Sequence, residues 1–195
     1  GRGGSGGRPY DSSLVLGSSS IRTSGESAPG IVGLSQGGTG GKGGTGKSFG
    51  DGGAGGTGGG GGSFEVYLYG QNSIATQGAD SHGIAVYSLG GNGGQTGDGS
   101  WISNPGPPGA AAASGPVTVD LSQSTASTIS TQGDNAFGIL AQSIGGAGGS
   151  GGSTVALGSV GGRAGPASAG GAVTVQNIGA IETGTNPAAS QNAGV

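Results

Sequence analysis

Short stretches in which apolar and polar residues alternate recur along the chain, with the two-residue period of β-strands. Four of them are SLVLG at 13–17, FEVYLYG at 64–70, VTVDLS at 117–122 and VTVQNIG at 173–179. β-Branched and aromatic residues at alternate positions are typical of strands. No stretch combines a helix cap with a 3.6-residue period, and the most helix-like residues, 110–113, lie between Pro and Gly. The pattern therefore predicts an all-β protein.

A longer pattern shows that the chain is built from repeats. A block of the form I-x-T-x-G-x-x-x-x-G-I-x-x-x-S-x-G-G-x-G-G begins at Ile21, Ile74 and Ile129, and a degenerate copy begins at Ile181. The leading isoleucines are 53, 55 and 52 residues apart (74−21, 129−74 and 181−129). A regular spacing of this kind indicates a repeat architecture. We divide the chain into a glycine-rich N-terminal segment (1–11), three repeats (12–63, 64–116 and 117–172) and a partial fourth repeat (173–195).

Each repeat reads as three strands followed by a glycine-rich excursion. Such a unit predicts a parallel β-solenoid of about four coils, in which equivalent strands stack about 4.8 Å apart. In-register stacking would align identical residues in columns, and glycines 25, 78 and 133 would occupy a corner that needs positive φ. The predicted structural ladder consists of Ile21, Ile74, Ile129 and Ile181; Thr23, Thr76, Thr131 and Thr183; Ile31, Ile84 and Ile139; and Ser35, Ser88 and Ser143.

The third strand of each repeat has apolar residues on both of its faces. One face would pack inside the coil, and the other needs a cover, supplied either by the glycine-rich excursions or by another subunit. The candidate subunit contacts on this outer face are Tyr87, Leu89, Leu140 and Ile144.

The glycine-rich excursions are runs of G-G-x, such as GGTGGKGG and GGAGGSGG. A three-residue period matches the polyproline II helix, and glycine at two of three positions would let such helices pack closely. Flexible linkers are the alternative interpretation. The sequence leaves both open.

Composition excludes several classes of function. Glycine accounts for 55 of 195 residues, only 8% of residues are charged, and cysteine is absent, so we expect no conventional enzyme core, disulfide or thiolate metal site. The net charge of −3 comes with scattered basic residues and predicts no nucleic-acid partner. No apolar run is long enough for a transmembrane helix, and no signal peptide is visible. We read the chain as a mature product or as a piece of a larger precursor.

The sequence GGKGGTGKS at 40–48 fits the phosphate-binding loop pattern G-x-x-x-x-G-K-[ST]. Such a loop must open a helix, which the glycines after Ser48 cannot sustain. His82, the single histidine, occupies a slot that holds Pro29 and Phe137 in the other copies, so we predict a structural role for it. We predict no enzymatic activity, catalytic residue, metal or cofactor. A further reading has Trp101 and other aromatic residues (Tyr67, Tyr69, Tyr87, Phe137) forming a sugar-stacking surface.

The blocks IATQGADSHGIAVYSLGGNGG at 74–94 and ISTQGDNAFGILAQSIGGAGGSGG at 129–152 resemble the glycine-rich repeats of large proteobacterial autotransporter passengers. The resemblance covers roughly residues 12–195. It implies an exported, extracellular β-solenoid on the bacterial cell surface with a role in adhesion, aggregation or biofilm formation.

These observations predict an extracellular structural protein that assembles with itself. The repeats show no charged or helical cap at either end, and exposed strand edges invite stacking into a filament. Two alternatives are a non-assembling stalk segment of a long autotransporter adhesin and a glycan-binding module. The predicted partners are further copies of the chain, cell-surface glycans or other matrix components.

Overall fold

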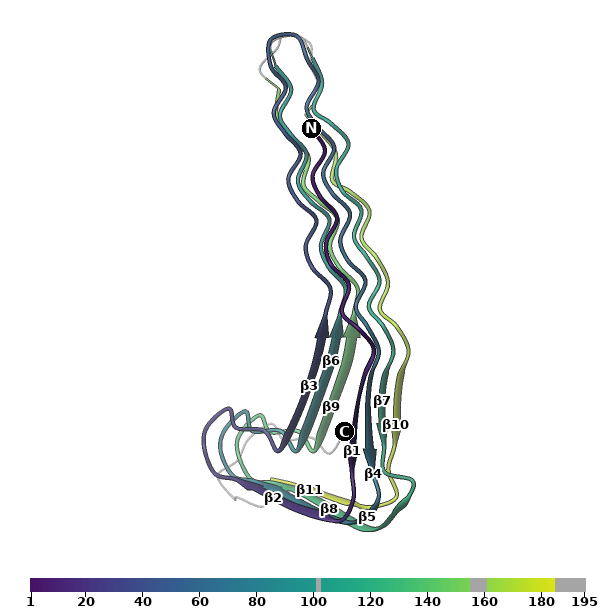
Figure 1. The fold of residues 1–195 in the computed structure, drawn as a ribbon. Helices are drawn as coiled ribbons and strands as arrows, with labels where there is room; N and C mark the ends of the chain where they lie inside the picture. Colours follow the sequence, from purple (N-terminus) through teal and green to yellow (C-terminus); the bar gives the residue numbers. More distant parts are fainter. Residues whose placement is uncertain (101–102, 155–160, 185–195) are drawn as a thin grey trace.

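The computed structural model describes residues 1–100, 103–154 and 161–184, and within these ranges it is an all-β solenoid without helices. Each complete coil consists of three strands, and all strand pairs are parallel (Figure 1). The predicted fold class, a parallel β-solenoid, is confirmed. The strands of the first coil are β1 (Ser12–Leu16), β2 (Ser19–Thr23) and β3 (Ile31–Gln36); those of the second are β4 (Phe64–Leu68), β5 (Gly70–Thr76) and β6 (Ile84–Leu89); those of the third are β7 (Val117–Asp120), β8 (Ser124–Thr131) and β9 (Ile139–Ile144); β10 (Val173–Gln176) and β11 (Ala180–Thr183) begin the fourth.

Stacking the coils produces three sheets. Their strand orders are β1-β4-β7-β10, β2-β5-β8-β11 and β3-β6-β9, which we call the first, second and third sheets. The strand register follows the repeat period, so equivalent residues of successive repeats lie side by side in one ladder. Ile21 pairs with Ile74, Ile74 with Ile129, and Ile129 with Ile181. The part of the fourth repeat after residue 184 lies outside the described residues.

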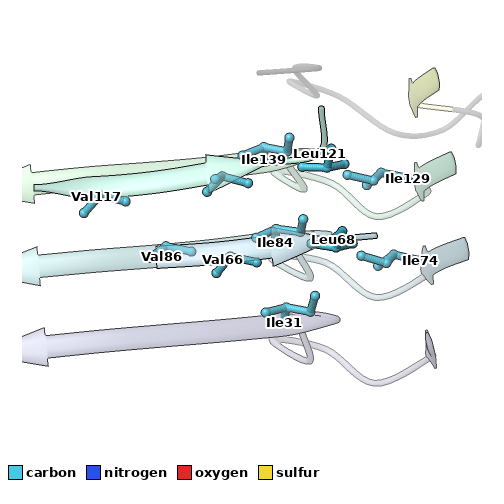
Figure 2. Packing of buried hydrophobic residues seen from close by; sticks show 11 residues of the cluster. Ile31, Val66, Leu68, Ile74, Ile84, Val86, Val117, Leu121, Ile129 and Ile139 are labelled. Atoms are coloured by element: carbon cyan, nitrogen blue, oxygen red, sulfur yellow. The ribbon is translucent and has the colours of Figure 1, made fainter. Parts of the chain in front are cut away.

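The apolar core is a set of layers, one for each coil, inside the three sheets (Figure 2). In the second layer, Val66 and Leu68 from the first sheet meet Ile74 from the second and Ile84 and Val86 from the third. Side chains that point inward alternate with outward ones because successive residues of a strand face opposite sides. The alternating stretches seen in the sequence supply these inward residues.

The core residues at the contact between the first and second coils differ from those at the contact between the second and third coils. Gly33 of β3 faces the ring of Phe64, and a Cβ at Gly33 would lie 2.7 Å from Phe64 Cζ. Where the second coil meets the third, two valines occupy the same positions: Val86 aligns with Gly33, and Val117 aligns with Phe64. A glycine and a phenylalanine at the first contact thus fill the space that two valines fill at the second.

The glycine-rich excursions form long arms that project from one side of the coils, beyond the third sheet, and return to the first sheet (Figure 1). We call residues 37–46, 90–99 and 145–154 the outgoing arms, and residues 1–8, 50–62, 104–115 and 161–171 the returning arms. Their backbones bond to each other every third residue. Gly37 donates to the carbonyl group of Leu89, at the end of β6, and Gly40 and Gly43 donate to those of Asn92 and Gln95 in the next outgoing arm.

The second glycine of each triplet bonds across to the antiparallel arms. Gly38 and Gly41 donate to the carbonyl oxygens of Gly7 and Gly4, at 2.8 and 2.7 Å, in the first returning arm. The outgoing arms therefore form one layer and the returning arms another, and most contacts between them are made by the backbone. The three-residue period is that of polyproline II helices. This hydrogen-bonded arrangement favours the helical interpretation of the arms over the linker interpretation.

The stretch at 110–113 illustrates how strongly this arrangement overrides local preference. Although consecutive alanines favour helix, these residues lie in a returning arm, where Ala112 donates to the Gly91 carbonyl and Ala111 to the Pro166 carbonyl.

Candidate interaction surfaces

The described part of the chain offers no cluster of metal-ligating side chains. No group of three or more His, Asp or Glu residues is placed to hold a metal ion within residues 1–100, 103–154 and 161–184. No helix long and apolar enough to cross a membrane occurs in the same ranges.

The phosphate-loop match lies in the first outgoing arm, where its backbone N–H groups are already used. Gly41 and Gly44 donate to the first returning arm, and Gly43 and Gly46 donate to the second outgoing arm. A phosphate cradle needs free N–H groups that converge on one point. Lys42 instead lies beside Asp98, with 3.9 Å between Nζ and Oδ2. The match thus follows from the G-G-x repeat of the arm.

The serine column joins the third sheet to the returning arms. Ser35 Oγ accepts a hydrogen bond from the N–H of Gly62 (3.0 Å). Ser88 Oγ donates to the Gly62 carbonyl (2.8 Å) and accepts from the N–H of Gly115 (2.9 Å), and both bonds are buried. Ser143 Oγ continues the column by donating to the Gly115 carbonyl (2.7 Å). These hydroxyl groups supply hydrogen-bond partners to the backbone N–H and C=O groups at the ends of the returning arms.

The threonine column closes the turn between the second and third sheets. In the first three repeats, the threonine hydroxyl donates to a carbonyl five residues further on: Thr23 to Ala28, Thr76 to Ser81 and Thr131 to Ala136. Thr183 pairs with Thr131 in β11. The isoleucine column of the third sheet, Ile31, Ile84 and Ile139, pairs in register beside these turns. The ladder residues therefore position the corners as well as the core.

The expected positive-φ corner glycines are not where the left-handed backbone lies. Neither Gly78 nor its equivalents at 25 and 133 have positive φ; the aligned residues Ser27, Asp80 and Asn135 do, with φ of 50°, 54° and 55°. Gly78 is required for a different reason, because a Cβ there would overlap the Gly25 carbonyl of the preceding coil. Asp and Asn tolerate the left-handed region better than most residues. The glycine column thus allows close stacking of coils.

His82 lies in this corner and has a structural role. Its Nδ1 accepts a hydrogen bond from the N–H of Phe137 (3.1 Å), and the two rings are 5.2 Å apart. Burial lowers the pKa of His82, against a smaller opposing effect from Asp80. Both the hydrogen bond and the burial favour the neutral imidazole.

A set of side-chain rungs, which the sequence pattern did not reveal, also links successive coils. In each, a side-chain oxygen accepts a backbone N–H one repeat further on: Asp11 from Ser63, Asp51 from Asn104, Asn92 from Ala147 and Asp98 from Ser153. These bonds lower the pKa of Asp11 and of Asp98. The separations of 52 to 55 residues equal the repeat period, which is the signal that could have found them.

The outer face of the third sheet differs from the other two outer faces. It carries Tyr87, Leu89 and Leu140, which are half-buried, and Ile144, which is 51% exposed. Val32 and Leu34, at 57% and 54%, are exposed on the same face. The glycine arms leave this face uncovered, so the first of the two expected covers is excluded for these exposed residues.

The aromatic residues proposed as a sugar-stacking surface lie on separate parts of the solenoid. Tyr67 belongs to β4 in the first sheet, Tyr87 to β6 in the third, and Phe137 to the corner beside His82. Trp101 lies outside the described residues. The described aromatic side chains therefore do not share one face.

Each sheet ends in strands that have a neighbour on one side only. Within the described residues, the first sheet ends in β1 and β10, the second in β2 and β11, and the third in β3 and β9. Unpaired strand edges offer rows of N–H and C=O groups to another chain.

Comparisons with known proteins assign the chain to no class. No protein-family model matches it, and no curated protein matches it. A solved structure to which it is similar is a springtail antifreeze protein from Granisotoma rainieri, described as a bundle of nine polyproline type II helices. The identity is 23%, the match covers 88% of this chain and 93% of that one, and the TM-score is 0.25. A similarity at this level carries no argument about fold or function.

Proposed function

We propose that the chain is an extracellular structural protein that stacks end to end with further copies of itself into a filament. The support comes from the open strand edges and from the charges beside them. The extracellular location and a role in adhesion or biofilm rest on the resemblance of the repeat blocks to autotransporter passengers.

The observation that carries the proposal is a pair of opposite charges at the two ends of one ladder. Along the outer face of the second sheet, the register aligns Arg22 with Ala75, Ser130 and Glu182. Both charged side chains are exposed, and the three strand spacings between them amount to about 14 Å. If β2 of one copy continued the sheet beyond β11 of another, Arg22 would lie directly opposite Glu182.

The same junction also continues the core columns. Ile21 would stack on Ile181, and Thr23 on Thr183, as the equivalent residues do inside the chain. Directly opposed opposite charges in a sheet contribute roughly 0.2–1 kcal/mol, and like charges oppose pairing by a similar amount. The charge pair would therefore select the head-to-tail order while the backbone and the core columns supply most of the association energy.

One pair of charges opposes this arrangement. The arm register aligns Arg2 with Ala54, Pro107 and Arg163, so the junction would bring Arg2 and Arg163 together. Both side chains are exposed, and exposed charges are screened at physiological salt. The opposing contribution is therefore small, and it is largest at low ionic strength.

A charge-swap series tests the proposal. Arg22→Glu and Glu182→Arg should each raise the critical concentration for assembly, by several-fold to about tenfold, because each puts like charges opposite each other. The double variant Arg22→Glu/Glu182→Arg should restore assembly, since the pair is opposite in sign again. Sedimentation and negative-stain electron microscopy measure the outcome.

Because the two residues are far apart within one chain, the rescue can only come from contact between copies. A wild-type chain that stays monodisperse at high concentration would contradict the proposal and favour the stalk-segment alternative. Assembly that is equal in all four proteins would show that other surfaces drive it.

A further inference from the structure

We propose that the outer face of the third sheet is a lateral seam, through which two stacks of this chain pair by the same face. This inference rests on the proposed end-to-end stacking and adds the surface that would join one stack to another.

The seam is defined by the outward residues of β3, β6 and β9, and it carries no charge. The strand registers align Val32 with Ala85 and Leu140, Leu34 with Tyr87 and Gln142, and Gln36 with Leu89 and Ile144. Seven of these nine side chains are apolar or aromatic, and the other two are glutamines.

The other two outer faces have a different character. Glu65 and Asp120 lie on the outer face of the first sheet, and Arg22 and Glu182 on that of the second. Exposed apolar area marks an interaction surface. On the third sheet no charge interrupts it, whereas on the first sheet the exposed Val15 shares its ladder with Asp120. The seam is therefore the face whose desolvation costs least.

Another copy of the same face is the occupant that fits best. A face without charges can meet itself about a two-fold axis without bringing like charges together. Facing sheets pack about 10 Å apart through interdigitated side chains, and Leu34, Tyr87 and Leu140 have the size for that gap.

The area of the seam decides when pairing occurs. Six residues at about 3.3 Å each and three strands at about 4.8 Å give a face of roughly 20 by 14 Å, or about 280 Å² per copy. Stable interfaces bury about 800 Å² on each partner, so two single chains would not hold together through the seam. Three stacked copies supply that area. Pairing is thus coupled to stacking, and dispersed chains stay single.

Mass-per-length measurement by scanning transmission electron microscopy tests the seam. With about four coils per chain, a single stack contains one chain per roughly 19 Å and a paired filament contains two. We expect two chains per 19 Å for the wild type and one for Tyr87→Glu, which puts a charge at the centre of the seam. Ser73→Glu is the matched control, because Ser73 is an exposed residue of the same coil on the second sheet, and it should keep two chains.

Leu34→Gln provides a second, milder variant. Because Leu34 is 54% exposed, the substitution should leave the fold intact. It should weaken pairing and raise the fraction of single stacks. Wild-type filaments of single mass, or Tyr87→Glu filaments that remain paired, would overturn the seam while leaving end-to-end stacking intact. An absence of filaments would instead overturn the stacking proposal and the seam with it.

Discussion

Two neighbouring glycines in a returning arm should respond in opposite ways to the same substitution. A Cβ at Gly59 would lie 1.9 Å from the Gly7 carbonyl oxygen, whereas a Cβ at Gly60 would lie 3.4 Å from its nearest atom, the Ala113 carbonyl oxygen. Gly59 is the second glycine of a triplet and points between the layers. Gly60 is the third residue and points outward, in line with Ala113.

The cost at Gly59 can be worked out from the hydrogen bonds around it. A normal carbon–oxygen contact is about 3.3 Å, so the arms must separate by roughly 1.4 Å. The bonds from Gly6 to Thr57 and from Gly38 to Gly7, both 2.8 Å, would then be lost. Two such bonds contribute about 1–3 kcal/mol and the strain a similar amount, partly offset by a gain of about 0.4–1 kcal/mol in the unfolded state. We expect a net loss of about 2–4 kcal/mol for Gly59→Ala.

For Gly60→Ala only the unfolded-state gain remains, about 0.4–1 kcal/mol. Urea unfolding followed by circular dichroism, at concentrations below assembly, measures both changes in the free energy of unfolding. The two variants should differ by about 3 kcal/mol, or roughly 6–12 °C in Tm. Equal effects at both positions would refute the packed-arm arrangement and favour the interpretation of the arms as flexible linkers.

Three further predictions concern the solenoid. Gly33→Val and Phe64→Val should each lower the free energy of unfolding by about 1–3 kcal/mol. The double variant should recover at least half of the summed loss, because it reproduces the valine pair Val86 and Val117. Additive effects in the double-mutant cycle would contradict this packing. Ser88→Ala should cost about 2–3 kcal/mol in urea unfolding, because two buried backbone groups lose their partner, and a loss under 0.5 kcal/mol would contradict the role of the column. Because burial lowers the pKa of His82, the neutral form stabilises the fold above the unfolded-state pKa of about 6.5, and that stability is lost as the pH falls through the folded pKa. His82→Phe should remove this step from a plot of Tm against pH, and a step that persists would assign it to other groups.

The architecture was predictable because one period governs both the sequence and the structure. A spacing near 53 residues leaves equivalent strands only one register, and Ile21, Ile74 and Ile129 follow it. The three-residue period of the arms was visible in the same way. The ordered packing of the arms was not predictable, because it depends on hydrogen bonds between residues far apart in the chain, such as Gly59 to Gly38 and Gly3 to Ala54.

The corner was mispredicted because glycine serves two purposes that look alike in a sequence. The aligned glycines at 25, 78 and 133 suggested a left-handed backbone. Gly78 and Gly133 are instead needed because each packs against the carbonyl group of the equivalent glycine in the preceding coil. The left-handed positions hold Ser27, Asp80 and Asn135, whose identities vary and which therefore gave no repeated signal. Likewise, the third strand's apolar outer face was visible in the sequence, but its exposure depends on where the arms run.

Helical reconstruction of assembled filaments by cryo-electron microscopy tests the central claim most directly. The account predicts that β10 and β11 of one copy lie about 4.8 Å from β1 and β2 of the next, with Glu182 beside Arg22 at every junction. Filaments joined through other surfaces, or a chain that remains a monomer under every condition in which filaments are sought, would contradict it.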